Sequence, residues 1–201
     1  MDLKKPLIAL ALIALMAAGF FLVRKSPEVA PSATAHRSSR LFNSLEWAML
    51  RQGVKCDRAG AYAEAAEWYR MAAERGLAEA QNNLGVMLKD GQGVMRDYAE
   101  AAHWFLLAAR QGYVLAQSNL GWLYQSGNGV EQNYAEARRW YLAAACRGHA
   151  AAQNNLGTMY RDGQGVEQNA DSARYWLQQA AAQGMQLAQR NLEKMDSAGA
   201  E

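Results

Sequence analysis

The fold of this chain is decided by residues 78–112, which read AEAQNNLGVMLKDGQGVMRDYAEAAHWFLLAARQG. The same landmarks return every 36 residues, as the Leu-Gly pairs do at 84–85, 120–121 and 156–157. A Trp keeps the same step, at Trp68, Trp104, Trp140 and Trp176. A fixed period between about 20 and 50 residues indicates stacked supersecondary units. Such proteins usually offer a surface to a partner rather than a chemical pocket.

Within one period the sequence predicts two helices. Residues 78–90 carry apolar side chains at helical spacing, so that one face of the helix is buried. The stretch Gly91–Val94 then interrupts the pattern, because closely spaced glycines permit the positive φ of a tight turn. Asp97 is a candidate N-cap with Glu100 three residues on, as in a capping box, and Gly112 ends the second helix.

This succession resembles the Sel-one-like repeat, a longer-looped relative of the tetratricopeptide repeat. The resemblance covers residues 41–195 and is carried by the motifs Ala-Gln-x-Asn-Leu-Gly, Gly-x-Gly-Val, Tyr-Ala-Glu-Ala and Trp-Tyr/Phe. It implies an all-α fold, a right-handed α-solenoid of helix-turn-helix repeats. The repeated residues, Trp140 among them, are expected to form its core.

The expected repeat domain spans residues 41–201. It contains hairpins 41–76, 77–112, 113–148 and 149–184, followed by a cap helix at 185–196. The first hairpin departs from the pattern, because Lys55–Arg58 stands where Gly-x-Gly-Val is expected and Gly60 supplies a shorter turn. We therefore expect its helices near 41–58 and 61–75. The lone last helix can cover the final apolar face, as a terminal cap must.

Residues 6–23 form a nearly unbroken apolar run with basic residues on both sides. A bilayer span needs about 20 apolar residues, with about 17 as the lower limit. The segment 1–25 is therefore predicted to be a single transmembrane helix, a signal anchor that precedes the solenoid. A cleaved signal peptide is the alternative, with Ala33-Thr34-Ala35 as its site. Residues 26–40 read as a flexible tether.

The two parts of the chain differ in charge. Residues 1–40 hold six Lys/Arg and two Asp/Glu, whereas residues 41–201 hold 15 and 17. The basic excess therefore lies in the anchor and tether, and the near-neutral repeats do not favour nucleic-acid binding. The short N-terminal tail favours an anchor that sends the repeats out of the cytoplasm, into the periplasm if the source is bacterial.

The reactive and metal-ligating residue types in this sequence do not form a catalytic or metal-binding set. Cys56 and Cys146 lie 90 residues apart, too far along a stack for a disulfide, and read as structural thiols. His36, His103 and His149 lack the spacing of a metal site. The sequence therefore predicts no catalytic residue, no cofactor, no metal and no small-molecule substrate, so that the protein is not an enzyme.

The variable positions of the first helices are the candidate partner-binding residues. By analogy with tetratricopeptide superhelices, they are expected to line the concave wall, where polar side chains bind an extended peptide and Trp122 is the apolar anchor. The candidates are Asn82, Val86, Lys89, Ser118, Trp122, Gln125, Asn154, Thr158, Arg161, Arg190 and Lys194. An ordinary solvated helix face is the alternative interpretation.

The sequence thus favours a non-catalytic protein–protein interaction scaffold that is tethered to a membrane. Relatives in the family have been linked to envelope assembly and to peptidoglycan, so a cell-wall-binding or envelope-assembly factor is the alternative. A β-lactam-binding or hydrolysing enzyme is a weaker one, because that branch of the family carries Cys pairs which this chain lacks.

Overall fold

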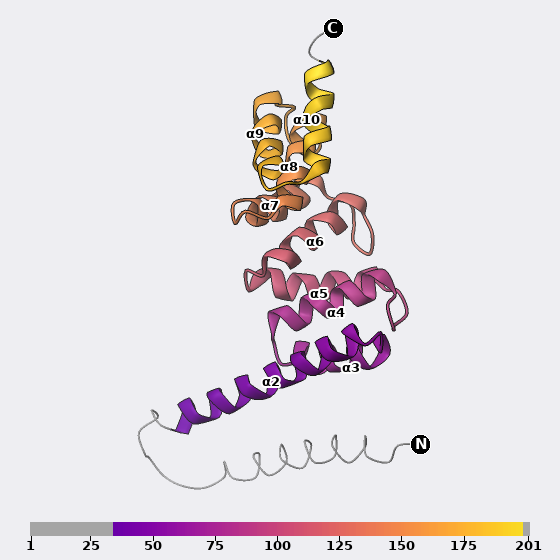
Figure 1. Cartoon of the computed structure of the whole chain (residues 1–201), viewed down its shortest axis with the longest axis vertical. Helices are drawn as coiled ribbons and strands as arrows, with labels where there is room; N and C mark the ends of the chain where they lie inside the picture. The colour runs from indigo at the N-terminus through magenta and orange to yellow at the C-terminus, as the bar shows by residue number, and fades with distance from the viewer. Residues whose placement is uncertain (1–33, 199–201) are drawn as a thin grey trace. The chain divides into compact units, whose positions relative to one another are not determined.

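The computed structural model describes residues 34–198, with side chains for residues 45–197. The chain divides into two units, Met1–Leu41 and Phe42–Glu201, and the repeats lie in the second. Residues 34–198 form nine helices and no strand (Figure 1). They are α2 (Thr34–Arg58), α3 (Tyr62–Ala73), α4 (Ala78–Asp90), α5 (Tyr98–Arg110), α6 (Val114–Ser126), α7 (Tyr134–Ala145), α8 (Ala150–Asp162), α9 (Ala170–Ala182) and α10 (Gln186–Ala198).

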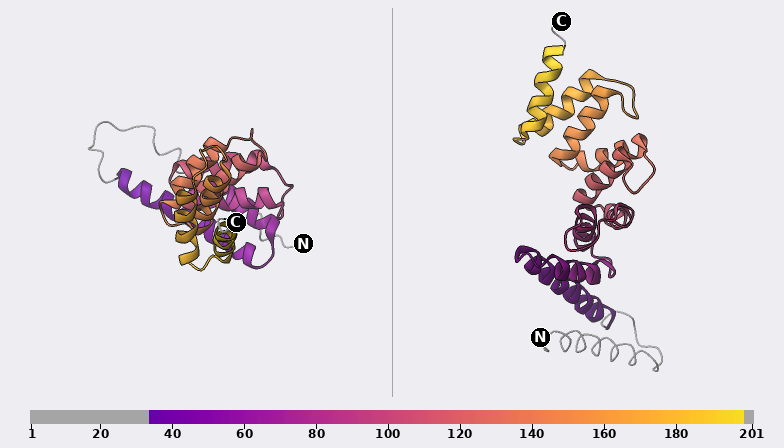
Figure 2. Two further views of the ribbon diagram at one scale, coloured as in Figure 1. Left: turned by 90° about the horizontal axis from the view of Figure 1, so that it is seen from above. Right: turned by 90° about the vertical axis from the view of Figure 1, so that its right-hand side faces the viewer.

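The repeat unit Phe42–Glu201 is a stack of helical hairpins. Each helix from α3 to α9 packs against the next helix in the chain, and α10 covers α9 and the edge of α8. Figures 1 and 2 show these hairpins following one another in chain order from α4 to α10. The all-α solenoid is confirmed, and the right-handed sense of its superhelix stays a prediction.

The N-terminal expectations are tested only in part. Helix α2 begins at Thr34, so residues 34–40 are helical and the tether prediction is corrected there. No proline follows Pro31 in this stretch, and nothing in it interrupts the helix that continues to Arg58. The apolar run 6–23 and residues 26–33 lie outside the described part. Among residues 34–198, no helix is long and apolar enough to span a bilayer.

The residue after each repeated Trp is a core position. Its occupants, Tyr69, Phe105, Tyr141 and Leu177, are at most 2% exposed. Of the Trp side chains only Trp104 is buried, and Trp140 lies half-buried against the core, so the core assignment of Trp140 is corrected. The ring of Tyr141 lies so close to Gly121 that a Cβ there would come within 2.8 Å of it. This contact explains why Gly follows Leu in the first helices.

The helix ends follow the local signals in the sequence. Asp97 caps α5, its side chain accepting a hydrogen bond from the Glu100 N–H at 2.9 Å. In a complete capping box the Glu100 carboxylate would also accept a hydrogen bond from the Asp97 N–H, but this bond is not among those that Glu100 makes. Its carboxylate instead accepts from Arg70 at 2.7 Å and from Trp104 Nε1 at 3.1 Å. The capping residue is thus correct, while Glu100 serves to connect α5 to the preceding hairpin.

The Gly-x-Gly-Val loop joins each hairpin to the one before it. Gly129 has φ +70°, and a Cβ on it would lie 2.3 Å from the carbonyl carbon of Tyr98, the first residue of α5. Gly93 and Gly165 meet Tyr62 and Tyr134 in the same way. We call this contact of a loop glycine with the start of the preceding second helix the loop junction. Only glycine fits there, because both the positive φ and the lack of space exclude a side chain.

Candidate functional site

Nine of the eleven predicted binding residues occupy three positions along α4, α6 and α8, the first helices of their hairpins, and the first of these positions is buried. Asn82, Ser118 and Asn154 are at most 8% exposed. Asn119 Nδ2 donates to Asn82 Oδ1 at 3.2 Å, and Asn191 Nδ2 donates to Asn154 Oδ1 at 2.9 Å. These side chains connect consecutive first helices, so the structure corrects their expected exposure to a partner.

The second position holds Val86, Trp122 and Thr158. Val86 is half-buried against the core, and Thr158 Oγ1 donates to the Asn155 carbonyl at 2.8 Å. Trp122 is different, because 38% of its surface is exposed. Its ring centroid lies 6.2 Å from that of Tyr98, and Lys89 Nζ lies 5.7 Å from the same ring. The indole is thus fixed by a cation and an aromatic ring while one side of it remains accessible.

The third position holds Lys89, Gln125 and Arg161. Each cation pairs with the carboxylate that follows it, Lys89 with Asp90 at 2.5 Å and Arg161 with Asp162 at 2.7 Å. The hydrogen bond with Asp162 raises the pKa of the Arg161 guanidinium. These partly exposed pairs contribute little to stability. They neutralise two of the four cations among the predicted binding residues.

Gln125 is held inside a chain of side-chain hydrogen bonds. Its Oε1 accepts from Tyr141 Oη at 2.9 Å, and its Nε2 donates to Gln164 Oε1 at 2.9 Å. Both polar ends of Gln125 therefore have partners within the protein. The last two candidates, Arg190 and Lys194, are exposed on α10.

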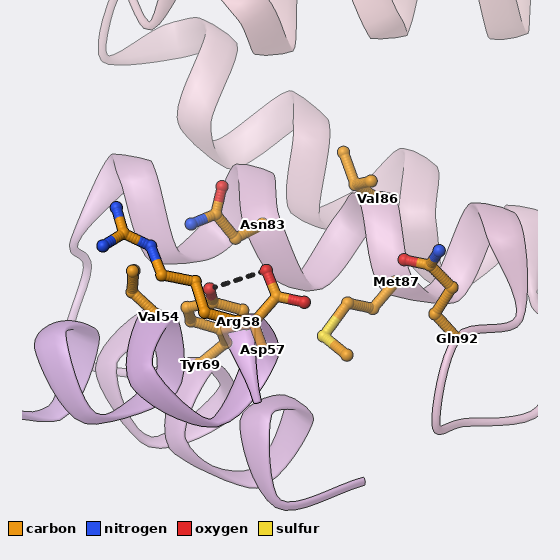
Figure 3. Close-up of a pocket in the computed structure, with 8 residues that line it drawn as sticks. All are labelled: Val54, Asp57, Arg58, Tyr69, Asn83, Val86, Met87 and Gln92. Atoms are coloured by element: carbon orange, nitrogen blue, oxygen red, sulfur yellow. Dashed lines mark hydrogen bonds between the residues drawn. The ribbon is translucent and has the colours of Figure 1, made fainter. Parts of the chain in front are cut away.

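A pocket that the sequence did not indicate lies between the first two hairpins. It measures about 230 Å³ and is lined by Val54, Asp57, Arg58, Tyr69, Asn83, Val86, Met87 and Gln92. Figure 3 shows Asp57 and Tyr69 joined by a hydrogen bond, with Arg58 and Asn83 toward one end and Met87 and Gln92 toward the other. Val86 is the one residue of this pocket that the sequence had named.

The phenol of Tyr69 is the most perturbed group of the pocket. Burial raises its pKa to about 12, and the Asp57 carboxylate adds to the rise. Tyr69 Oη donates to Asp57 Oδ2 across a long 3.5 Å. The phenol therefore stays protonated at neutral pH and serves as a hydrogen-bond donor.

Side chains with catalytic or metal-binding potential do not gather anywhere in residues 45–197. No group of three His, Cys, Asp or Glu in that part could hold a metal ion. Both thiols are free, with Cys56 buried and Cys146 exposed. Cys146, which the sequence suggested to be a structural thiol, is the exposed C-cap residue of α7.

His149 gives the fold a pH dependence. It is the N-cap of α8, and its Nδ1 accepts from the Ala152 N–H at 3.3 Å. Burial lowers the pKa of His149 below its usual 6.5. The unfolded chain therefore binds the proton more readily, so the contribution of this cap is present above about pH 6.5 and is lost as the pH falls through the folded pKa.

We expect the wild type to lose about 1 kcal/mol of unfolding free energy through this cap between pH 7 and pH 5. His149→Asn is the matched control, because Asn caps a helix without titrating in this range. Urea unfolding at both pH values measures the difference between the two proteins. An equal loss in both would show that the His149 cap does not cause it.

The stacked hairpins define an all-α repeat protein, and the side chain of Trp122 is an accessible aromatic group on one of them. The Sel1 repeat matches this chain four times, at residues 49–77, 78–113, 114–149 and 150–185. Since these matches cover more than half of the sequence, the chain belongs to the Sel1 repeat family. Proteins of this family are generally non-catalytic scaffolds for protein–protein interaction.

Two solved structures support the assignment. A protective antigen of uropathogenic Escherichia coli strains, which displays an SLR fold, is 33% identical with a TM-score of 0.74, over 84% of this chain and 37% of that one. A Sel1 repeat protein from Oxalobacter formigenes is 33% identical with a TM-score of 0.65, over 69% of this chain and 57% of that one. The chain thus spans less than two thirds of either relative. No curated protein matches it.

Proposed function

We propose that this protein is a non-catalytic, membrane-tethered interaction scaffold whose first helices bind an extended segment of a partner protein. The observation that carries the proposal is the state of Trp122. Its equivalents in the neighbouring hairpins are the smaller Val86 and Thr158. A large aromatic side chain that is held in place yet 38% exposed is typical of a binding hot spot.

The surroundings of Trp122 favour a peptide over a charged ligand. Lys89 and Arg161 are neutralised by their neighbouring carboxylates, and no free anion-binding cluster surrounds the indole among the described residues. A peptide requires an apolar anchor and a few hydrogen bonds rather than a strong field. The partner-binding set is therefore reduced to the accessible members, centred on Trp122 and excluding Asn82, Ser118 and Asn154.

The membrane tether of the proposal rests on the sequence of residues 6–23. We propose that this run is retained as a single-pass anchor and that the repeats face away from the cytoplasm. Alkaline phosphatase fused to the C-terminus should be active in the cell of origin, since the enzyme needs an extracytoplasmic compartment. Activity of a cytoplasmic reporter in place of the phosphatase would show that the repeats face the cytoplasm.

Photo-crosslinking tests the binding proposal. A photoreactive phenylalanine analogue at position 122 of the full chain should capture one partner protein in the cell, identified by mass spectrometry. The same analogue in place of Gln178, an exposed residue of the second helix α9, is the control and should not capture it. Equal capture at both positions would contradict a site at Trp122. Retention on isolated cell wall, or turnover of a β-lactam, would support the alternative functions instead.

A further inference from the structure

The spaces between successive first helices are built alike but filled differently. Gly53 faces the ring of Tyr69 just as Gly85 faces that of Phe105 and Gly121 that of Tyr141. This places the first hairpin in register with the others. Val54, Val86 and Trp122 are then equivalent residues in successive hairpins, and so are Asp57, Lys89 and Gln125. The three inter-hairpin spaces can therefore be compared directly.

Two of these spaces are filled by the protein itself. Between the second and third hairpins, the indole of Trp122 occupies the space and lies against Lys89. Between the third and fourth, the chain Tyr141–Gln125–Gln164 bridges it with two hydrogen bonds of 2.9 Å. Between the first and second, Val86 is too small to do what Trp122 does, and the space is the pocket of about 230 Å³.

The polar groups around this pocket have few partners within the protein. Gln92 occupies the position in the second hairpin that Gln164 occupies in the fourth. Gln164 faces Gln125 and bonds to it, whereas Gln92 faces Asp57, and no hydrogen bond joins Gln92 to Asp57. No hydrogen bond or ion pair involves the side chains of Gln92 or Arg58 within the described residues, and Asp57 has only the long bond from Tyr69. Donors of Arg58 and Gln92 and acceptors of Asp57 and Gln92 are thus available around an apolar centre formed by Val54, Val86 and Met87.

The size of the pocket limits the occupant. Sites for small molecules measure about 300–1,000 Å³, so this pocket holds one side chain with its adjoining main chain. The apolar centre suits an aliphatic or methionine side chain. An amide N–H of the main chain can donate to Asp57, and a carbonyl oxygen can accept from Gln92 or Arg58. An isolated charge is disfavoured, because Asp57 and Arg58 together leave the pocket near neutral.

We propose that this pocket binds an aliphatic or methionine residue of an extended peptide, and that Trp122 contacts a second apolar residue three positions along the same peptide. The spacing follows from the stack. Successive hairpins advance by about 10 Å, and a peptide in the extended polyproline II conformation advances by about 3.1 Å per residue with three residues per turn, so that residues three positions apart lie on the same face. The inference rests on the proposed function and adds to it a second anchor site and a sequence requirement on the partner.

Selection from a library of displayed random 12-residue peptides tests the proposal with the full chain as bait. Peptides retained by the wild type should be enriched in pairs of apolar residues three positions apart. Val86→Trp fills the pocket in the way that Trp122 fills the next one, so the fold should tolerate it. The enriched peptide should bind this variant at least about tenfold more weakly by fluorescence anisotropy. Gln178→Trp adds the same side chain elsewhere and should bind like the wild type.

Gln92→Ala keeps the test decisive if Val86→Trp does not fold, since it removes one hydrogen-bond donor from the surface and should weaken binding about fivefold. Enriched peptides that bind Val86→Trp and Gln92→Ala as tightly as the wild type, yet lose affinity for Trp122→Ala, would overturn the pocket and leave the proposed function standing. Selection that enriches no peptide on the wild type would overturn both.

Discussion

Replacing Trp122 by Ala should weaken binding of a peptide partner by at least about 30-fold without unfolding the repeats. An aromatic anchor buried against a partner contributes about 2 kcal/mol or more, which corresponds to that factor. The helix should persist because Leu120 and Leu123, which are at most 1% exposed, carry its packing. Fluorescence anisotropy measures the affinity, and circular dichroism measures the helix content of the same samples.

Charge variants on the same wall serve as the comparison for Trp122→Ala. Lys89→Ala and Arg161→Ala should weaken binding much less, because each cation is already paired with its neighbouring carboxylate. Their effects should grow at low salt, where surface charges are least screened. Loss of helix content in Trp122→Ala would show instead that this indole is part of the core.

Replacing Tyr141 by Ala should lower the free energy of unfolding by about 3–5 kcal/mol, whether or not a partner is present. Tyr141 is fully buried on α7, where its ring lies against Gly121 of α6, so its removal leaves a cavity in the core. Tyr141→Phe keeps the ring and loses only the hydrogen bond to Gln125, so it should cost about 1 kcal/mol.

Chemical denaturation of the two Tyr141 variants separates the packing from the hydrogen bond. A larger loss in Tyr141→Phe than in Tyr141→Ala would contradict the packing argument. Trp140→Ala should cost less than Tyr141→Ala, because Trp140 is only half-buried.

The elements that local chemistry determines could be predicted from the sequence. The helix expected at residues 78–90 is α4, with Gly91 in the left-handed conformation at its C-cap and Asp97 capping the next helix. Periodicity and capping residues act within one or two turns, so a single sequence contains them. The 36-residue step then repeats the same prediction along the chain.

The wall was harder to predict, because it depends on contacts between hairpins. The sequence shows that Asn82 and Asn154 lie beside the apolar stripe. It does not show that Asn119 of the next hairpin and Asn191 of the last helix α10 cover them. The pocket was missed because the first hairpin was aligned on a 36-residue step. From Gly53 to Tyr69 is 16 residues, against 20 from Gly85 to Phe105, and matching these glycines would have placed Asp57 opposite Gln92.

The loop junction has a consequence for how such a chain can lengthen during evolution. A duplicated segment of 36 residues brings its own second-helix Tyr and its own loop glycine. Inserted between existing hairpins, it can therefore form a loop junction with the hairpin before it and another with the hairpin after it. At the ends this does not hold: the first hairpin has no Gly-x-Gly-Val loop, and α9 begins with Ala170 where α5 and α7 begin with Tyr. Gene duplication is therefore expected to add repeats inside the array, while its two terminal hairpins keep their own sequences.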